Sequence, residues 1–135
     1  MTLNRKKIYL LIDNVSTVDR AIYYFYKDQW NKESLVAGVE DVLSMLEKII
    51  LKLKIQWTEV EAIGVVVGLG SFTSTRVAVT VANVLHLAFG LSVFGLSVPD
   101  FGLFEKEYEK NPAGYLSATY SGLANVGKNK KKINL

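Results

Sequence analysis

The sequence has no cysteine, which excludes disulfide bonds, thiolate metal sites and cysteine nucleophiles. It has one histidine, His86, too few for a multi-histidine metal cluster and an argument against a protease-type triad. We also expect no secretory signal, because the apolar run 8–12 ends at Asp13 and is too short to be the apolar part of such a signal. We therefore expect a cytoplasmic protein.

Charged residues are few and unevenly placed. They make up 21% of the 135 residues, against 50% apolar residues, which is typical of a globular chain. The formal net charge of +3 arises at the ends: four lysines lie in residues 128–135, and Arg5, Lys6 and Lys7 lie near the start. This placement indicates solubilising tails, with transient contact to RNA or an acidic partner as the alternative.

The first half of the chain predicts three strands and a helix. Residues 7–13, 19–26 and 30–35 are rich in β-branched and aromatic residues, and the short connections between them favour antiparallel pairing. In residues 36–54 the apolar residues recur at spacings of three and four, which predicts one helical face turned to a core.

The second half predicts strands that alternate with helices. Residues 62–68 form a continuous apolar run, as in a strand buried on both faces, and 92–97 predict another strand. Helices are expected over 75–89 and from Pro99 to about Lys110. The order is strand, strand, strand, helix, strand, helix, strand, helix, which predicts an α/β domain with a mixed sheet covered by helices.

The expected domain covers residues 1–110, and residues 111–135 are expected to form a C-terminal tail with a basic end.

The segment 77–98 allows another interpretation. Residues 77–98 contain no charged residue, and 22 such residues are long enough to cross a bilayer. Polar residues and glycines interrupt the window, so a soluble helix followed by a buried strand explains it better. We expect no membrane segment.

The first candidate site follows the first strand. Asp13 ends that strand, and Asn14, Ser16 and Thr17 come directly after it. An acid at a strand end with hydroxyls in the following turn can hold a metal-bound phosphate. The same residue types are common in plain turns, so both interpretations stay open.

A second candidate is the glycine- and hydroxyl-rich segment 68–76. Backbone N–H groups at the start of a helix can hold an anion, and Arg76 could reinforce them. The segment matches neither a Walker A loop nor the dinucleotide fingerprint. A tight strand-to-helix turn is the alternative.

The helix over 75–89 presents two dissimilar sides. One, predicted to face the core, holds Val77, Ala78, Val81, Val84, Leu85 and Ala88. The other, predicted to be an interface with another chain, is only half polar and holds Arg76, Val79, Thr80, Asn83, His86 and Leu87. Partial cover by the same domain is the alternative. His86 has no orienting partner at helical spacing and is expected to be a surface or interface residue.

The stretch 68–76, G-L-G-S-F-T-S-T-R, resembles the hallmark G-P-G-S-F-T-G-L-R of the TsaB (YeaZ) family. Residues 12–17, I-D-N-V-S-T, are similar to the family's I-D-T-S-T at the end of its opening strand. Residues 90–97 stand where the family has a strand of the type G-x-P-x-x-G-V-S. The resemblance covers residues 7–100. Leu69, Ser74 and Thr75 replace the usual Pro, Gly and Leu.

The resemblance implies the ribonuclease H-like lobe of the actin, Hsp70 and sugar-kinase superfamily. It implies a non-catalytic accessory subunit in threonylcarbamoyladenosine modification of tRNA, with no catalytic residue, metal or cofactor of its own. The partners that the resemblance implies are a TsaD-type catalytic subunit, a TsaE-type protein as a further member, and a second copy when the chain is alone. Contact with tRNA would be indirect.

Most of the family's second lobe is missing, so the resemblance implies a one-lobe form without a nucleotide cleft and without ATPase activity. Asp13, Ser16 and Thr17 would form at most half of a nucleotide site, possibly vestigial. The alternative function is a minimal nucleotide- or phosphate-binding hydrolase that uses Asp13 and the segment from Gly68 to Arg76.

Overall fold

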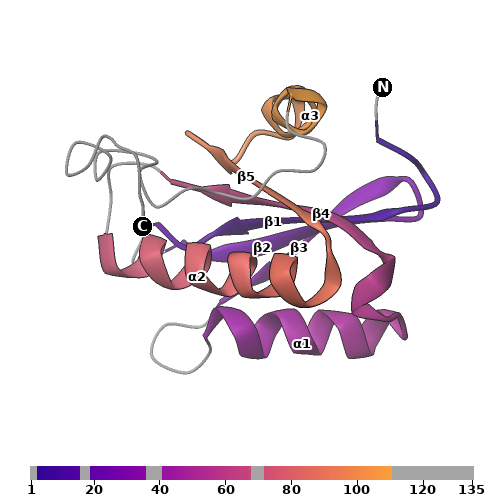
Figure 1. Cartoon of the computed structure of the whole chain (residues 1–135), viewed down its shortest axis with the longest axis horizontal. Coiled ribbons are helices and arrows are strands. Elements are labelled where there is room, and N and C mark those ends of the chain that lie inside the picture. The colour runs from indigo at the N-terminus through magenta and orange to yellow at the C-terminus, as the bar shows by residue number, and fades with distance from the viewer. Residues whose placement is uncertain (1–2, 16–18, 36–40, 68–71, 111–135) are drawn as a thin grey trace.

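The fold is a five-stranded mixed sheet with helices on both faces (Figure 1). The computed structural model describes residues 3–15, 19–35, 41–67 and 72–110, so the expected tail 111–135 lies outside the described residues. The strands are β1 (Ile8–Asp13), β2 (Ala21–Tyr26), β3 (Gln29–Ser34), β4 (Val60–Val66) and β5 (Ser92–Leu96). The helices are α1 (Val42–Leu53), the short 3-10 helix η1 (Trp57–Glu59), α2 (Phe72–Phe89) and α3 (Phe101–Lys110).

The strands lie in the order β3-β2-β1-β4-β5. β1 and β2 are antiparallel, as are β2 and β3, whereas β1 pairs with β4 and β4 with β5 in parallel. The prediction of a mixed sheet in an α/β fold is therefore confirmed. The carboxyl ends of β1, β4 and β5 meet at one edge of the sheet.

The β2–β3 hairpin turns through Lys27 and Asp28, which both have positive φ angles, 52° and 67°. Two such residues form the type of turn whose twist matches that of the flanking strands. β3 starts at Gln29, one residue before the predicted strand 30–35.

Helix α1 begins later than predicted. Asp41 is its N-cap, with Oδ1 accepting the N–H of Ser44 at 2.7 Å. The helix ends at Lys54, whose left-handed conformation (φ 56°) turns its N–H back to the carbonyls of Ile50 and Leu51. Residues 36–40, the first part of the predicted helix, lie outside the described residues. The 3-10 helix η1 was not predicted.

Each face of the sheet has its own core. α1 and α2 cover one face, where Leu10, Ile12 and Ile63 are fully buried. α3 covers the other face through an aromatic cluster in which Phe104 packs edge-on against Tyr9 and Phe94. β4 is buried over almost its whole length, as its unalternated apolar run predicted.

The uncharged window 77–98 is divided between two elements. α2 ends at Phe89, Gly90 turns the chain with φ 77°, and β5 begins at Ser92. None of the helices in the described part of the chain combines the length and the apolar character needed to cross a membrane.

Gly64 on β4 is a position where any side chain would collide with the α3 core. A Cβ there would lie 2.8 Å from two ring carbons of Phe104 and 3.1 Å from Phe94. We expect Gly64→Ala to lower the free energy of unfolding by about 1–3 kcal/mol, as overpacking of a tight core does. Urea unfolding measures this. Adding Phe104→Leu should recover part of the loss, so additive losses would contradict the assigned contact.

Candidate functional site

The outward side of α2 is apolar and exposed. Val77 is 44% exposed, Val84 56% and Leu87 83%, and Thr80 and Ala88 lie exposed between them. Arg76 at one end is the single formal charge on this side. Solvated helix faces normally carry more charge, so this side has the composition of an interface.

The prediction of which side of α2 faces the core was wrong by about one residue, or 100° of helix rotation. Val79, predicted to lie at the interface, is buried, whereas Val77, Val84 and Ala88, predicted to face the core, are exposed. The buried side holds Thr75, Ala78, Val79, Ala82 and Leu85. Ala78 and Ala82 are fully buried one turn apart, and their small side chains let the helix approach the sheet closely.

The remaining predicted interface residues divide into two groups. Arg76, Thr80 and Leu87 are exposed on the outward side. Asn83 and His86 are half-buried, and His86 Nδ1 lies 2.7 Å from the carbonyl oxygen of Leu91, across the turn between α2 and β5. His86 therefore ties this turn rather than projecting freely from the surface.

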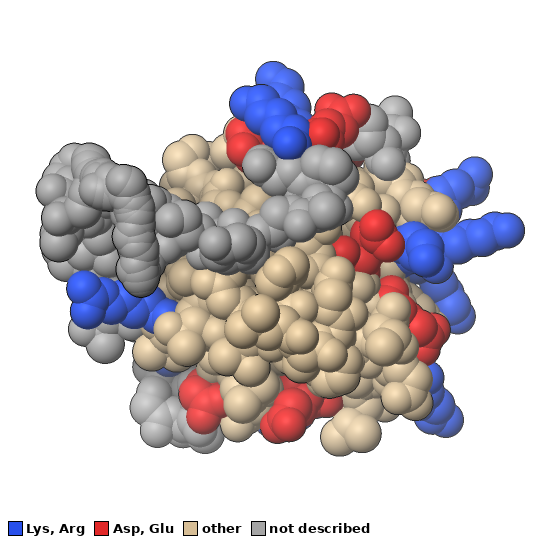
Figure 2. Space-filling model, in the orientation of Figure 1, with Lys and Arg blue, Asp and Glu red and all other residues tan. Residues whose placement is uncertain are grey.

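Helix α1 extends the exposed apolar surface. Leu43 and Leu51 lie two turns apart on α1 and are 44% and 76% exposed, and the exposed Glu47 lies one turn from each, so a charge stands between the two leucines. The space-filling view shows a broad area without charge over α2, with acidic residues along the lower edge (Figure 2). We call Leu43, Leu51, Val77, Thr80, Val84 and Leu87 the docking face. Leu43 was predicted to face the core, and no periodicity in the sequence marked Leu51 as part of a surface.

The strand-end candidate site is only partly described. Asp13 closes β1 and is half-buried, and its Oδ1 accepts the N–H of Val15 at 3.4 Å. Asn14 is buried, and its Oδ1 lies 3.3 Å from Nη1 of Arg20, a contact that the sequence did not suggest. Ser16 and Thr17 lie outside the described residues, as do residues 68–71 of the glycine- and hydroxyl-rich segment 68–76.

Burial raises the pKa of the Asp13 carboxyl above its ordinary value, and nearby Asp19 adds to the effect. The Val15 N–H and Lys32 act in the opposite direction. Because β1 and β4 are parallel neighbours, Asp13 lies at the sheet edge from which the chain leads into α2. Ligands of α/β sheets bind at such carboxyl ends. Among the described residues, no group of three acidic or histidine side chains is placed to hold a metal ion.

A family model described as "TsaD: tRNA N6-adenosine threonylcarbamoyltransferase" matches residues 37–122, which is more than half of the chain. The chain belongs to the TsaD family. The match includes α1, β4, α2, β5 and α3, and so includes the whole docking face. None of the curated proteins matches this TsaD-family chain.

Solved structures show the same fold. The chain is similar to YeaZ from Pseudomonas aeruginosa, with a TM-score of 0.61 and 20% identity over 67% of this chain and 44% of that one. A second structure, an uncharacterized protein with similarity to peptidase YEAZ from Pseudomonas aeruginosa, gives a TM-score of 0.60 and 20% identity over 67% and 43%. The TsaB (YeaZ) resemblance and the ribonuclease H-like fold are confirmed. This TsaD-family chain spans less than half the length of either structure.

Because the pKa of Asp13 is raised in the folded state, ionising its carboxyl lowers the free energy of unfolding. This loss of stability is absent at pH values below the ordinary pKa of aspartate. It grows as the pH rises toward the pKa of Asp13 in the folded state, and above that pKa it is complete. Asp13→Asn keeps an oxygen for the Val15 N–H, so we expect its melting temperature to exceed the wild-type value at pH 7.

The gain should shrink as the pH falls toward 4. Thermal unfolding between pH 4 and 7 measures it. Asp28→Asn, in the exposed hairpin turn, is the control and should change little. A destabilised Asp13→Asn at pH 7 would show instead that the carboxylate is needed in its charged form.

Proposed function

We propose that this chain is a non-catalytic accessory subunit of tRNA threonylcarbamoyladenosine modification that binds a TsaD-type protein through the docking face. Alone, it pairs with a second copy through the same surface. It contacts tRNA only through its partner, a TsaE-type protein is a possible further member of the assembly, and it acts in the cytoplasm.

The exposed apolar surface of α1 and α2 is the observation that carries this proposal. Six side chains from two packed helices contribute to it. The five large apolar ones are each between 44% and 83% exposed: Leu43, Leu51, Val77, Val84 and Leu87. Leaving such side chains in water costs about 25 cal/mol for each Å² of apolar surface, and a partner that covers them recovers that free energy. Contiguous apolar surface on a small domain is typical of a protein–protein interface.

The family match supports the choice of pathway. The matched model is named for tRNA N6-adenosine threonylcarbamoyl transfer, and the fold is that of YeaZ. Asp13 supports an accessory role, because its carboxyl is half-buried and bonded to its own turn and its pKa is raised. Part of the hydrogen-bonding capacity of this carboxyl is thus used within its own turn.

A minimal nucleotide- or phosphate-binding hydrolase is the second candidate. The position of Asp13 at the carboxyl edge of the parallel strands favours it, since this edge is where α/β sheets bind their ligands. Isothermal titration with ATP and magnesium separates the two candidates. Binding with turnover that Asp13→Ala abolishes would establish the hydrolase, whereas the accessory-subunit proposal expects no turnover.

Leu87→Glu and Val84→Glu test the docking face, because each places a charge in the middle of the apolar surface. We expect either variant to weaken binding to a TsaD-type protein from the same organism at least tenfold, or about 1.4 kcal/mol. Neither side chain belongs to the core, so the melting temperature should stay near the wild-type value. Biolayer interferometry measures the affinity, and light scattering measures self-association.

Val98→Glu is the matched control, since Val98 is 52% exposed but lies outside α1 and α2, between β5 and α3. It should bind like the wild type. A folded wild-type chain that neither binds the TsaD-type protein at micromolar concentration nor self-associates would overturn the proposal. Equal losses in all three variants would place the interface elsewhere.

A further inference from the structure

β3 forms one edge of the sheet, and its register shows which backbone groups face away from β2. The Leu35 N–H donates to the Arg20 carbonyl at 2.9 Å, which makes residues 20 and 35 a hydrogen-bonded pair. Such pairs alternate along an antiparallel ladder. The backbone N–H and C=O groups of Trp30, Lys32 and Ser34 therefore point outward, to the open edge.

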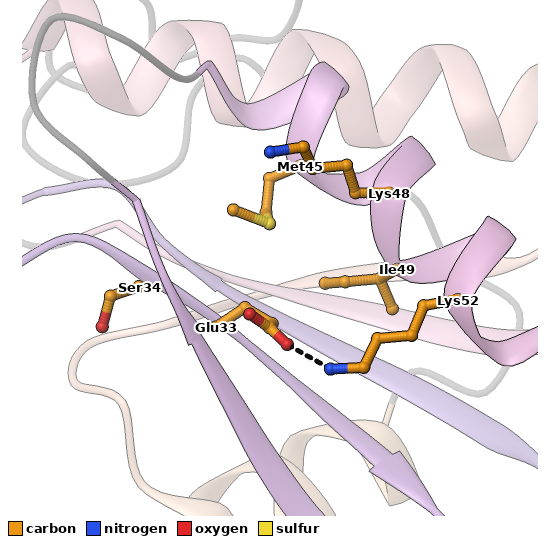
Figure 3. Close-up of a pocket in the computed structure, with 6 residues that line it drawn as sticks. All are labelled: Glu33, Ser34, Met45, Lys48, Ile49 and Lys52. Carbon is orange, nitrogen blue, oxygen red and sulfur yellow. Dashed lines mark hydrogen bonds and ion pairs between the residues drawn. The ribbon is translucent and has the colours of Figure 1, made fainter.

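A groove lies beside this edge, between β3 and α1 (Figure 3). Its volume is about 380 Å³, and it is lined by Glu33, Ser34, Met45, Lys48, Ile49 and Lys52. Met45 and Ile49 are buried and supply an apolar floor. Lys48 and Lys52 lie one turn apart on α1, and Nζ of Lys52 bonds Oε2 of Glu33 at 2.6 Å.

We infer that the β3 edge and this groove bind an extended acidic segment of a partner protein, which adds a sixth strand beside β3. The outward groups of Trp30, Lys32 and Ser34 would pair with its backbone. Alternate side chains of the added strand would point toward α1 and meet Lys48 and Lys52. This surface is distinct from the docking face, since it uses another side of α1, and it goes beyond the proposed function.

The charges and the spacing of the groove favour an acidic occupant. The groove holds two lysines and one acid, so it carries a net positive charge. Lys48 and Lys52 are about 6 Å apart along the helix, and alternate residues of a strand are about 6.6 Å apart. Two acidic residues at alternate positions can therefore each face one lysine. Among the described residues, Lys32 and Ser34 on this edge are exposed, as the addition of a strand requires.

A blocked heptapeptide of alternating valine and glutamate, titrated into the full ¹⁵N-labelled chain, tests the inference. We expect chemical-shift changes centred on β3 and on Lys48 and Lys52. The amides of Trp30, Lys32 and Ser34 should exchange with solvent at least fivefold more slowly, whereas those of Asn31 and Glu33 are already paired with β2. A heptapeptide of alternating valine and lysine should bind at least tenfold more weakly.

Three variants make the test specific. Ser34→Pro removes one outward N–H without removing a bond to β2, a position where edge strands tolerate proline, and should weaken binding severalfold. The double variant Lys48→Gln and Lys52→Gln should weaken it at least tenfold, whereas Lys106→Gln, on α3, should not change it. Glu33→Gln should tighten binding, because Glu33 competes for Lys52.

Several results would overturn the inference. One is an absence of binding at millimolar peptide by the folded chain, and another is a set of shifts that map to the docking face. A third is an affinity unchanged by Ser34→Pro and by the lysine variants. Loss of TsaD binding in Leu87→Glu with peptide binding intact would show that the two surfaces act separately, so each proposal can fail alone.

Discussion

The arrangement depends on β4, a strand that must be covered on both faces. Its inner residues Ile63 and Val65 face α1 and α2, while Gly64 and Val66 face α3. An apolar strand flanked by parallel neighbours on both sides cannot leave either face in water without losing the free energy of burial. Two helices therefore pack on one side and one on the other, and this three-layer arrangement determines which helical surfaces are left outside.

The two faces of β4 are covered in different ways. On the α3 side, the ring of Phe104 lies over Gly64, and the aromatic cluster fills the layer completely. On the opposite side, α2 contributes Ala78 and Ala82 together with Val79 and Leu85 to the core, and its other large apolar residues are not needed there. The valines and leucines that remain are turned outward. The part of the docking face on α2 thus consists largely of apolar residues that the core does not take up.

The way the helices cover the sheet explains which elements could be predicted from the sequence and which could not. α1 carries Glu47, Lys48 and Lys52 away from the core, and its periodicity located the helix; β4 was recognisable from its apolar run. In α2, 12 of the 18 residues are Val, Ala, Leu or Thr, so hydrophobic periodicity could not separate the inner from the outer side, and the predicted face was rotated by one residue. Which alanines contact the sheet is determined by tertiary packing, and no local pattern in the sequence reveals it.

The candidate sites also divide into features with a local sequence signal and features that depend on tertiary packing. Asp13 was identified because an acid after an apolar strand is a local signal, but its contact to the turn and the Asn14–Arg20 pair depend on how the hairpin folds back. The groove beside β3 had no signal at all, because it joins residues of β3 and α1 that only tertiary packing brings together.

α1 contributes residues to three different parts of the molecule. Leu46 and Ile49 face the sheet, Leu43 and Leu51 face outward beside α2, and Lys48 and Lys52 flank the β3 edge. At 100° per residue, Leu43 and Lys52 lie on opposite sides of the helix axis, and Leu51 lies between Leu43 and Lys48. A partner on the docking face would leave the lysines accessible, and a strand added to β3 would leave Leu43 and Leu51 accessible. The two proposed surfaces thus use different sides of α1, which Leu46 and Ile49 anchor in the core between them.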